Sequence, residues 1–373
     1  MKTKLPIAAL ALLAHVAAAP AVHAQAAAAQ SAGRTAASPL APSEIVAAAP
    51  AGDWRAIAAA DLLVMTLAPD ARGPSTGSGS RRVVIQLMPP PLSQGWVGNI
   101  RKLAAAHWWD GLSVNRVQDN YVAQWGDADG DDKAKARALP TGLAVVPESE
   151  YASTVDQVGE AHALTVPKPT SDISLRAAQA EALVAASEAE SRRDENGLIA
   201  MQDTRTPKAP NGWHDRDSYA EWVEVYGGWP LASDRKAMWP VHCYGMVGVG
   251  RDLSPNTGTG AELYTVIGHA PRHLDRNIAL VGRVIEGIEH LSSLPRGTEA
   301  LGFYKTAAER TPIASIRLGG EVADLPRYEY LSTESGSFAR YADARANRRD
   351  AFFIRPAGGA DICNIPVPVR RVK

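Results

Sequence analysis

The sequence has few cysteines, few phenylalanines and almost no net charge. Its 373 residues include two cysteines, Cys243 and Cys363, which is too few for a disulfide scaffold or a four-thiolate zinc site. The 39 basic and 40 acidic side chains leave a formal net charge of -1. Nonspecific nucleic-acid binding needs a basic surface. We therefore expect no nucleic-acid partner.

The motifs of common nucleotide, metal and hydrolytic sites are also missing. The sequence has no glycine-rich phosphate loop followed by Lys and Ser or Thr and no HExxH, and its GxSxG match at 73–77 lies in a Gly/Ser-rich loop, not in the elbow of a serine hydrolase. His269 and His273 stand four residues apart, but Pro271 between them disfavours the helix that would bring both imidazoles to one metal. The glycines at 245, 248 and 250 lack the parallel-sheet context of a dinucleotide site. We expect neither a metal nor a cofactor.

The first 24 residues have the pattern of a secretory signal peptide. Lys2 and Lys4 precede an apolar run over 7–19, and the segment ends in Val22-His23-Ala24, with short side chains where signal peptidase requires them. The apolar run is too short to span a bilayer, and no later stretch is long enough. We predict cleavage after Ala24, export to the periplasm and a mature chain that is not embedded in a membrane.

The rest of the chain divides into a leader, a domain with an insert, and a tail. Residues 25–52 are mostly Ala, Ser, Pro and Gly, and predict a flexible leader because they bury too little apolar surface to offset ordering entropy. A patterned domain is expected over 53–318, interrupted by an insert at 128–238 with an Ala/Glu-rich helix over 174–193. The tail, 319–373, has mixed charge and predicts an irregular extension.

Aromatic residues gather at the end of the insert and just beyond it. At this density, aromatic residues usually pack onto a neighbouring core. A binding surface lined by them is the alternative. The residues concerned are Trp213, Tyr219, Trp222, Tyr226, Trp229 and Trp239.

The two cysteines have two possible states. Export would carry Cys243 and Cys363 into an oxidising compartment, where we predict that they pair and tie the tail to the domain. The alternative is two separate thiols, because Cys243 lies in an apolar strand and would be buried there.

Apolar patterns predict many short strands and two helices. The predicted strands cover 62–67, 82–88, 113–118, 121–125, 243–249, 261–267, 278–284 and 313–318, and the predicted helices cover 93–108 and 285–294. Strands and helices do not alternate, so a parallel sheet is disfavoured. We predict a mainly β fold, a closed antiparallel barrel with helical caps.

One segment carries a pattern with recognisable chemistry. Residues 116–127 read RVQDNYVAQWGD, with Arg116 and Gln124 on two strands that flank a turn. Taken alone, the segment is an ordinary hairpin with a surface arginine. The pattern RVxxxYVxQxGD, however, resembles the signature of the cyclophilins, and further blocks follow the order of that family. These blocks lie at 99–100, 108–111, 245–248, 255–257, 260–264, 274–277 and 281–287.

The resemblance covers about 82–127 and 241–318, and it implies a fold and an activity. The fold is an eight-stranded antiparallel barrel capped by two helices. The activity is peptidyl-prolyl cis-trans isomerisation of Xaa-Pro segments in unfolded or partly folded proteins, and we expect a monomer. By motif position, Arg116 and Gln124 are the catalytic residues, with Gln124 bonding the substrate backbone. The resemblance gives the proline pocket as Tyr121, Val122, Tyr264 and Leu274.

This chain departs from the family around the pocket. Family members commonly carry Trp at His273, His at Ile278, Gln at Glu262, Met at Val122, and Phe at both Tyr121 and Tyr264. These changes reshape the rim of the pocket. We therefore add Glu262, His273 and Ile278 to the expected substrate-binding residues.

The chemistry of amide rotation explains why an arginine belongs there. Partial double-bond character opposes rotation about the peptide C–N bond by about 18–20 kcal/mol. A guanidinium aimed at the prolyl nitrogen stabilises the twisted form, in which the nitrogen lone pair is localised. Arginine stays protonated at any working pH. We interpret the chain as an exported isomerase that assists the folding of exported proteins.

The alternative function is a proline-peptide binding or chaperone module with little turnover. The altered pocket rim and the aromatic-rich insert favour it. The retained Arg116 favours the enzyme, because binding alone would not require a cation there.

Two expectations concern residues around the catalytic arginine. Strand alternation places Glu262 and Tyr264 on one face, so we expect the Glu262 carboxylate to contact Arg116 and orient its guanidinium. The insert 128–238 lies outside both motif blocks, so we expect it to be dispensable for turnover of short peptides.

Overall fold

The computed structural model describes residues 39–69, 81–165, 213–214 and 216–372. From Leu40 onward these residues belong to one unit. The predicted signal peptide, 1–24, and the predicted helix over 174–193 lie outside the described residues. No helix in the described ranges is long and apolar enough to cross a membrane.

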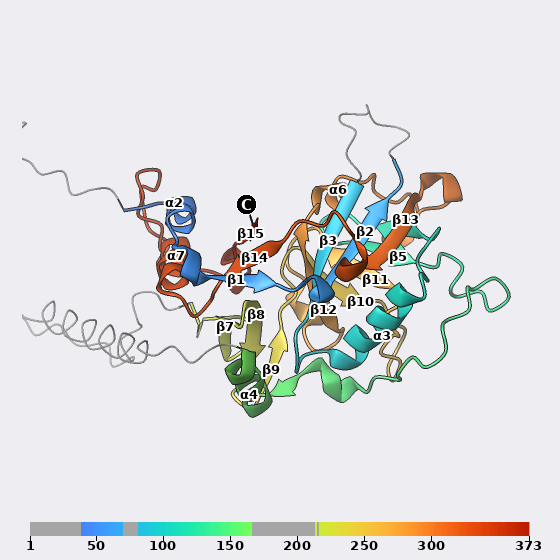
Figure 1. Ribbon diagram of the computed structural model, residues 1–373, viewed down its shortest axis with the longest axis horizontal. Helices are drawn as coiled ribbons and strands as arrows, with labels where there is room; N and C mark the ends of the chain where they lie inside the picture. The colour runs from blue at the N-terminus through green and yellow to red at the C-terminus, as the bar shows by residue number, and fades with distance from the viewer. Residues whose placement is uncertain (1–38, 70–80, 166–212, 215, 373) are drawn as a thin grey trace, which may run out of the picture. The chain divides into compact units, whose positions relative to one another are not determined.

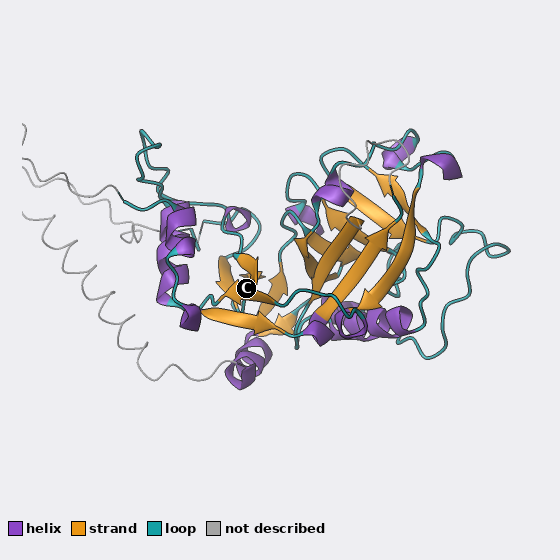
Figure 2. Ribbon diagram, turned by 45° about the horizontal axis from the view of Figure 1, so that its top comes forward, coloured by secondary structure: helices purple, strands orange, loops and turns teal. Residues whose placement is uncertain are grey.

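Eight antiparallel strands close into a barrel (Figures 1 and 2). In spatial order they are β10 (Met246–Val249), β11 (Leu263–Val266), β5 (Val122–Gly126), β4 (Ser113–Val117), β13 (Thr311–Leu318), β2 (Leu62–Leu67), β3 (Arg81–Leu87) and β12 (Leu280–Glu286). The predicted fold class, a mainly β closed eight-stranded barrel, is confirmed. Each predicted strand overlaps one strand of the barrel.

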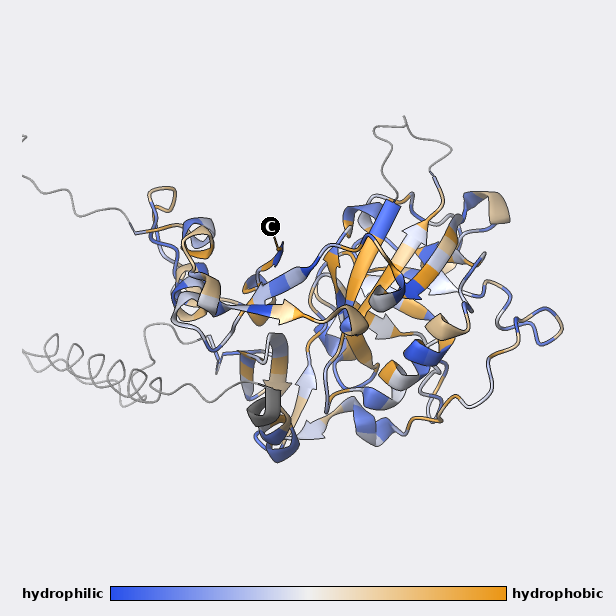
Figure 3. Ribbon diagram, in the orientation of Figure 1, coloured by the Kyte–Doolittle hydropathy of each residue, from blue (hydrophilic) through white to orange (hydrophobic). Residues whose placement is uncertain are grey.

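Strand alternation explains how the apolar run of β2 is used. Leu63, Met65 and Leu67 belong to the main core, whereas Leu62 belongs to a second buried cluster that includes Tyr328 of the tail. Successive side chains of a strand point to opposite faces. Both faces of β2 are therefore covered, which is why its sequence is continuously apolar rather than alternating. Figure 3 shows this apolar character along the barrel strands.

One long helix and one short helix accompany the barrel. The helix α3 (Gln94–Ala105) buries Trp96, Ile100 and Leu103. It ends in a left-handed residue, His107, and the next residue, Trp108, donates its N–H to the carbonyl of Leu103, which is a Schellman ending. The prediction of a helix over 93–108 is confirmed.

The second predicted helix is much shorter than expected. Only α6 (Glu289–Ser292) is helical, and residues 285–286 continue β12. Gly287 separates the two with a φ of 84°, and a Cβ there would lie 2.1 Å from the carbonyl oxygen of Arg82. The close approach of β3 therefore ends the strand and delays the helix.

The tail and part of the predicted leader are ordered, which corrects two predictions. The helix α2 (Pro42–Ala47) lies within the predicted leader 25–52 and packs beside α7 (Gly336–Ala346) (Figure 1). In both segments apolar side chains are buried, Ile45 in α2 and Phe338 in α7. Composition alone could not predict this, because each segment needs a partner about 290 residues away in sequence.

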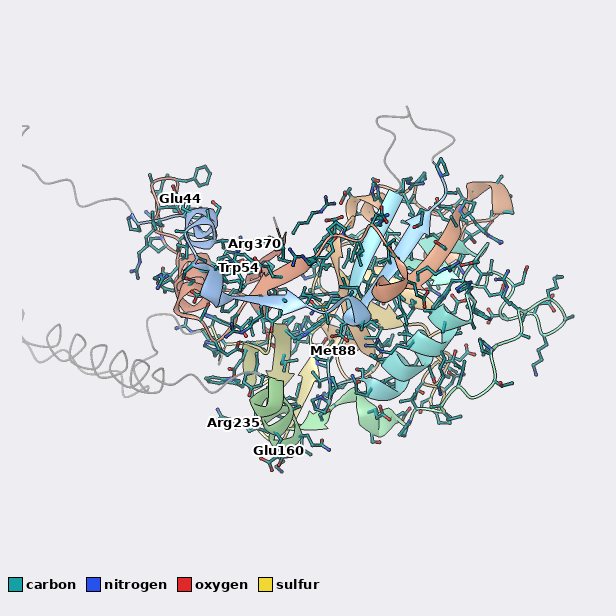
Figure 4. All side chains as sticks on the ribbon, viewed as in Figure 1. Glu44, Trp54, Met88, Glu160, Arg235 and Arg370 are labelled. Atoms are coloured by element: carbon teal, nitrogen blue, oxygen red, sulfur yellow. A yellow bond between two sulfur atoms is a disulfide. The ribbon has the colours of Figure 1, made fainter. Side chains whose placement is uncertain are left out.

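A small sheet joins the two ends of the described chain. It contains β1 (Trp54–Ile57), β14 (Tyr328–Leu331) and β15 (Val369–Arg371) in the order β1-β14-β15. The guanidinium of Arg370 lies 3.7 Å from the centroid of the Trp54 ring (Figure 4). The tail therefore contains regular secondary structure, which an irregular extension would lack.

The described part of the insert contributes a four-stranded sheet and one helix. The strands are β6 (Ser153–Thr154), β9 (Ala237–Pro240), β8 (Trp229–Ser233) and β7 (Trp222–Tyr226), and the helix is α4 (Val155–Thr165). Trp213, Trp229 and Trp239 are buried in the main core, whereas Tyr219 is exposed. The packing interpretation of these aromatic residues is therefore correct for the three tryptophans.

A disulfide connects the barrel to the tail. Cys243, just before β10, is bonded to Cys363, which lies 120 residues later in the short helix η8 (Ile362–Asn364). Closing so long a loop restricts the unfolded chain, an effect typically worth about 2–4 kcal/mol. We predict that Cys363→Ser lowers the free energy of unfolding by about that amount, measured by urea denaturation against unreduced, disulfide-bonded wild type.

Thiol titration supplies the independent check on this disulfide. Unreduced wild-type protein, denatured and titrated, should show no free thiol. Two free thiols would contradict the pairing.

Candidate active site

A cavity of about 630 Å³ opens beside β4, β5 and β11. Eight of the nine predicted site residues line it, and these are Arg116, Tyr121, Val122, Gln124, Glu262, Tyr264, Leu274 and Ile278. The ninth, His273, is exposed and is not among the lining residues, so its assignment to the site is not supported. Its neighbour Leu274, in the same short helix η4 (Arg272–Leu274), does line the cavity.

Strand register brings the polar residues of the site together. Gln124 on β5 pairs with Arg116 on β4 and with Tyr264 on β11. Residues directly opposite each other on adjacent strands place their side chains on the same face of the sheet. One face of three neighbouring strands therefore carries the arginine, the amide and the aromatic ring side by side.

The apolar wall of the cavity is a small cluster separate from the main core. Val122, Tyr264 and Val266 are buried in it, and Tyr121 and Ile278 pack against them. The Tyr264 ring occupies space that only a glycine leaves open, since a Cβ on Gly248 would lie 2.3 Å from the phenol oxygen. The cavity therefore has an apolar wall beside its polar residues.

The guanidinium of Arg116 is fixed by three hydrogen bonds. Its Nε donates to the carbonyl of Leu301 at 2.7 Å, and its terminal nitrogens donate to the amide oxygens of Gln124 and Gln118. A guanidinium has five N–H groups. Two of them therefore remain for a substrate.

Two aromatic rings flank the same guanidinium. The Arg116 carbon Cζ lies 5.6 Å from the Tyr121 ring centroid and 5.3 Å from the Phe303 ring centroid. Burial lowers the pKa of Arg116, and Tyr121 partly offsets this. Arginine titrates so far above neutrality that the group stays a cation. The site therefore presents a fixed positive charge at the edge of an apolar pocket.

Sequence reasoning missed three of the residues that hold Arg116. Gln118 could have been found, because it lies two residues along the same strand direction and so points to the same face. Leu301 and Phe303 could not have been found in this way. They belong to a turn in which Leu301 has a φ of 58°, and Phe303 forms an isolated β-bridge with Arg116. That contact joins positions about 185 residues apart, and no local pattern indicates it.

Glu262 lines the cavity but does not contact Arg116, which corrects the predicted orienting contact. One carboxylate oxygen, Oε1, accepts the Asp127 N–H at 2.6 Å, and Oε2 is buried without a hydrogen-bond partner among the described residues. All three hydrogen bonds of the guanidinium go to other groups. Gln124 hydrogen-bonds Arg116 and lies next to Glu262, so any effect of Glu262 on the arginine passes through Gln124.

The environment of Glu262 opposes its ionisation. Burial raises the pKa to about 7, although the Asp127 N–H and the side chains of Asn115 and Gln124 lower it in part. A glycine at 126 is required, because a Cβ there would lie 2.0 Å from Oε1. The carboxylate is thus enclosed and titrates near neutral pH.

One family model and several solved structures match this chain. Residues 78–317 match the family model described as cyclophilin type peptidyl-prolyl cis-trans isomerase/CLD. The crystal structure of cyclophilin AquaCyp293 from Hirschia baltica is similar at a TM-score of 0.52 and 17% identity, covering 86% of this chain and 94% of that one. A Cryptosporidium parvum cyclophilin crystallised with the dipeptide Ala-Pro matches at a TM-score of 0.32 and 8% identity, covering 69% and 98%. No curated protein matches the sequence significantly.

The raised pKa of Glu262 predicts a pH dependence of stability. The pKa rises from 4.5 to about 7 on folding, so between these values the folded state binds more protons than the unfolded state. Stability is therefore greatest below about pH 4.5 for this group and is lost as the pH rises to about 7. Glu262→Gln should remove this loss and be more stable than wild type at pH 8 by about 3 kcal/mol.

Urea denaturation at pH 5, 6, 7 and 8 measures this effect. The matched control is Glu148→Gln, which makes the same change at an exposed glutamate. Parallel pH profiles for wild type and Glu262→Gln would show that Glu262 does not titrate in this range.

Proposed function

Because the chain belongs to the family of cyclophilin-type peptidyl-prolyl cis-trans isomerases, we propose that Arg116 and the apolar wall beside it carry its isomerase activity. The observation that supports this most strongly is the fixed guanidinium. Three hydrogen bonds and two rings hold it at the rim of a cavity lined by Val122 and Tyr264. A preorganised charge costs no reorganisation at the moment of reaction, which is what makes such groups effective.

The proposed mechanism divides the work between the apolar wall and the cation. The proline ring is held against the apolar wall, so the rest of the peptide turns relative to it. The two unused N–H groups of Arg116 act on the prolyl nitrogen as its lone pair becomes localised in the twisted amide. This interaction is stronger in the transition state than in either planar form, so it lowers the barrier. No covalent step is needed.

Gln124 has two roles in this mechanism. Its amide oxygen accepts from Arg116 at 3.1 Å and fixes the direction of the guanidinium. Its amide nitrogen carries two N–H groups. One of them can bond the substrate backbone while the other faces Glu262. We propose Tyr121, Val122, Tyr264, Leu274 and Ile278 as the residues that contact the proline ring and its flanks.

We further propose that the physiological substrates are proteins that fold after export. The signal-peptide pattern at residues 1–24 supports this, and the Cys243–Cys363 disulfide is typical of an oxidising compartment. Uncatalysed Xaa-Pro isomerisation takes about 10–100 s at 25 °C. An isomerase in the periplasm would remove that delay from the folding of exported chains.

Loss of the guanidinium should abolish most of the turnover. We predict that Arg116→Ala lowers the catalytic efficiency by about 10²-fold or more, as for removal of one electrostatic donor from other enzymes. The measurement is two-dimensional exchange spectroscopy on a short Xaa-Pro peptide. Arg101→Ala is the control, since Arg101 lies on α3 and pairs with Asp61 outside the cavity. Wild-type exchange rates in Arg116→Ala would refute the mechanism.

Catalysed refolding separates the enzyme from the chaperone alternative. The wild type should accelerate the proline-limited slow phase of a small exported protein, and Arg116→Ala should not, because only turnover depends on the guanidinium. The measurement is the rate constant of the slow phase against catalyst concentration. Equal acceleration by both proteins would favour a binding or chaperone module instead.

A further inference from the structure

A chain of buried polar side chains runs from the insert to the back of the pocket wall. Its members, from the pocket outward, are Tyr264, His242, Asp275, Arg272 and Asp217. The phenol oxygen of Tyr264 lies 2.8 Å from Nε2 of His242, and Nδ1 of His242 lies 2.8 Å from the Asp275 carboxylate. Arg272 then bonds Asp275 at 2.7 Å and Asp217 at 2.7 and 2.9 Å.

The direction of each hydrogen bond follows from the chemistry of the groups. Burial lowers the pKa of His242, and Asp275 opposes this only in part, so the ring is neutral. A carboxylate paired with Arg272 can only accept, so the ring proton is on Nδ1 and Nε2 is an acceptor. Burial also raises the pKa of Tyr264 well above its usual value, so its hydroxyl stays protonated and donates to Nε2.

Arg272 links the two carboxylates of this chain of polar side chains. Its side chain is 2% exposed, as is that of Asp217. Burial alone would lower its pKa, but the hydrogen bond with Asp217 and the charge of Asp275 more than compensate and raise it. The ring of Tyr219 lies 5.1 Å from the same guanidinium. Both Asp217 and Tyr219 belong to the insert 128–238.

The segment that contains Arg272 and Asp275 also carries two residues of the pocket. Leu274 lies between Arg272 and Asp275 in sequence, and the Ile278 N–H donates to the Leu274 carbonyl at 3.1 Å. Both side chains line the cavity. Through Arg272 the insert therefore contacts two parts of the pocket, the Tyr264 ring by way of His242 and the turn that presents Leu274 and Ile278.

We propose that Asp217 of the insert is a positioning residue for the proline pocket, acting through Arg272, Asp275 and His242 on Tyr264. This rests on the proposed function, since it assigns the pocket to the proline ring. It also replaces the expectation that the insert is dispensable for short peptides. A charge so deeply buried must be balanced, and one of the two carboxylates that balance Arg272 comes from the insert.

The experiment compares Asp217→Asn with a matched change in the same insert. Glu221→Gln also turns a carboxylate into an amide, but Glu221 is 63% exposed, pairs with Arg235 at 3.4 Å and does not touch the chain of polar groups. Peptide affinity comes from titration of a short Xaa-Pro peptide, and the exchange rate is measured at saturating peptide. Urea denaturation confirms that each variant is folded.

A displaced pocket wall weakens binding of planar and twisted amides alike, so affinity should change more than the rate at saturation. We expect Asp217→Asn to raise the peptide Kd about three- to tenfold and to change the saturated exchange rate less than about twofold, in the range of couplings between contacting residues. Glu221→Gln should change neither. An unchanged Kd in folded Asp217→Asn would overturn the proposal.

A double-mutant cycle separates positioning from general stabilisation. Tyr264→Phe keeps the ring but removes the hydroxyl. It therefore removes the hydrogen bond to His242 and leaves Asp217 paired with Arg272. In that background Asp217→Asn should raise the Kd less than about twofold, because contacting networks are not additive. The same increase in both backgrounds would show a purely structural role. The cycle can be read from binding alone, so it remains valid even if wild type binds peptide without accelerating exchange, which would refute the proposed function instead.

Discussion

The site depends on the antiparallel register of β4, β5 and β11. Gln124 faces Arg116 on one side and Tyr264 on the other. A shift of one residue in either pairing would turn every side chain of the moved strand to the opposite face. The arginine, the amide and the aromatic ring would then no longer share one surface. The barrel closure, the glycines at 126 and 248 and the turn around Leu301 all serve to keep this register and to make room for the side chains.

Polar groups are hydrogen-bonded to both Arg116 and Tyr264, and the two sets of groups differ in their charge. Beside Arg116, the neutral amide of Gln124 connects to Glu262, whose pKa is about 7. Behind Tyr264, a neutral imidazole connects to a buried arginine held between two carboxylates. Buried polar groups cost free energy unless they are bonded. Both sets of polar groups are bonded to side chains that line the cavity.

Much of the barrel and most of the site could be predicted from the sequence, because they depend on local patterns. Apolar runs and alternation located the strands, and the motif around Arg116 together with the later blocks of the resemblance located eight residues that do line the cavity. The pairing of α2 with α7, the bond from Arg116 to Leu301 and the link from Asp217 to Arg272 could not be predicted. Each joins segments that are far apart in sequence, and each involves residue types that are equally common on a solvated surface. Glu262 is a further example. Strand alternation correctly predicted that its side chain faces the cavity, but not that it bonds Asp127 instead of Arg116.

The central claim is that a fixed guanidinium, and not simply a positive charge, lowers the barrier to rotation. Arg116→Lys tests it most directly, because lysine keeps the charge but lacks the planar fork that bonds Leu301, Gln124 and Gln118 together. Two quantities are measured, the cis-trans exchange rate of a bound Xaa-Pro peptide and the Kd of that peptide. The account predicts a rate at least about tenfold lower, with the Kd changed less than about threefold, because the donor acts mainly in the transition state. A rate equal to that of wild type would contradict it.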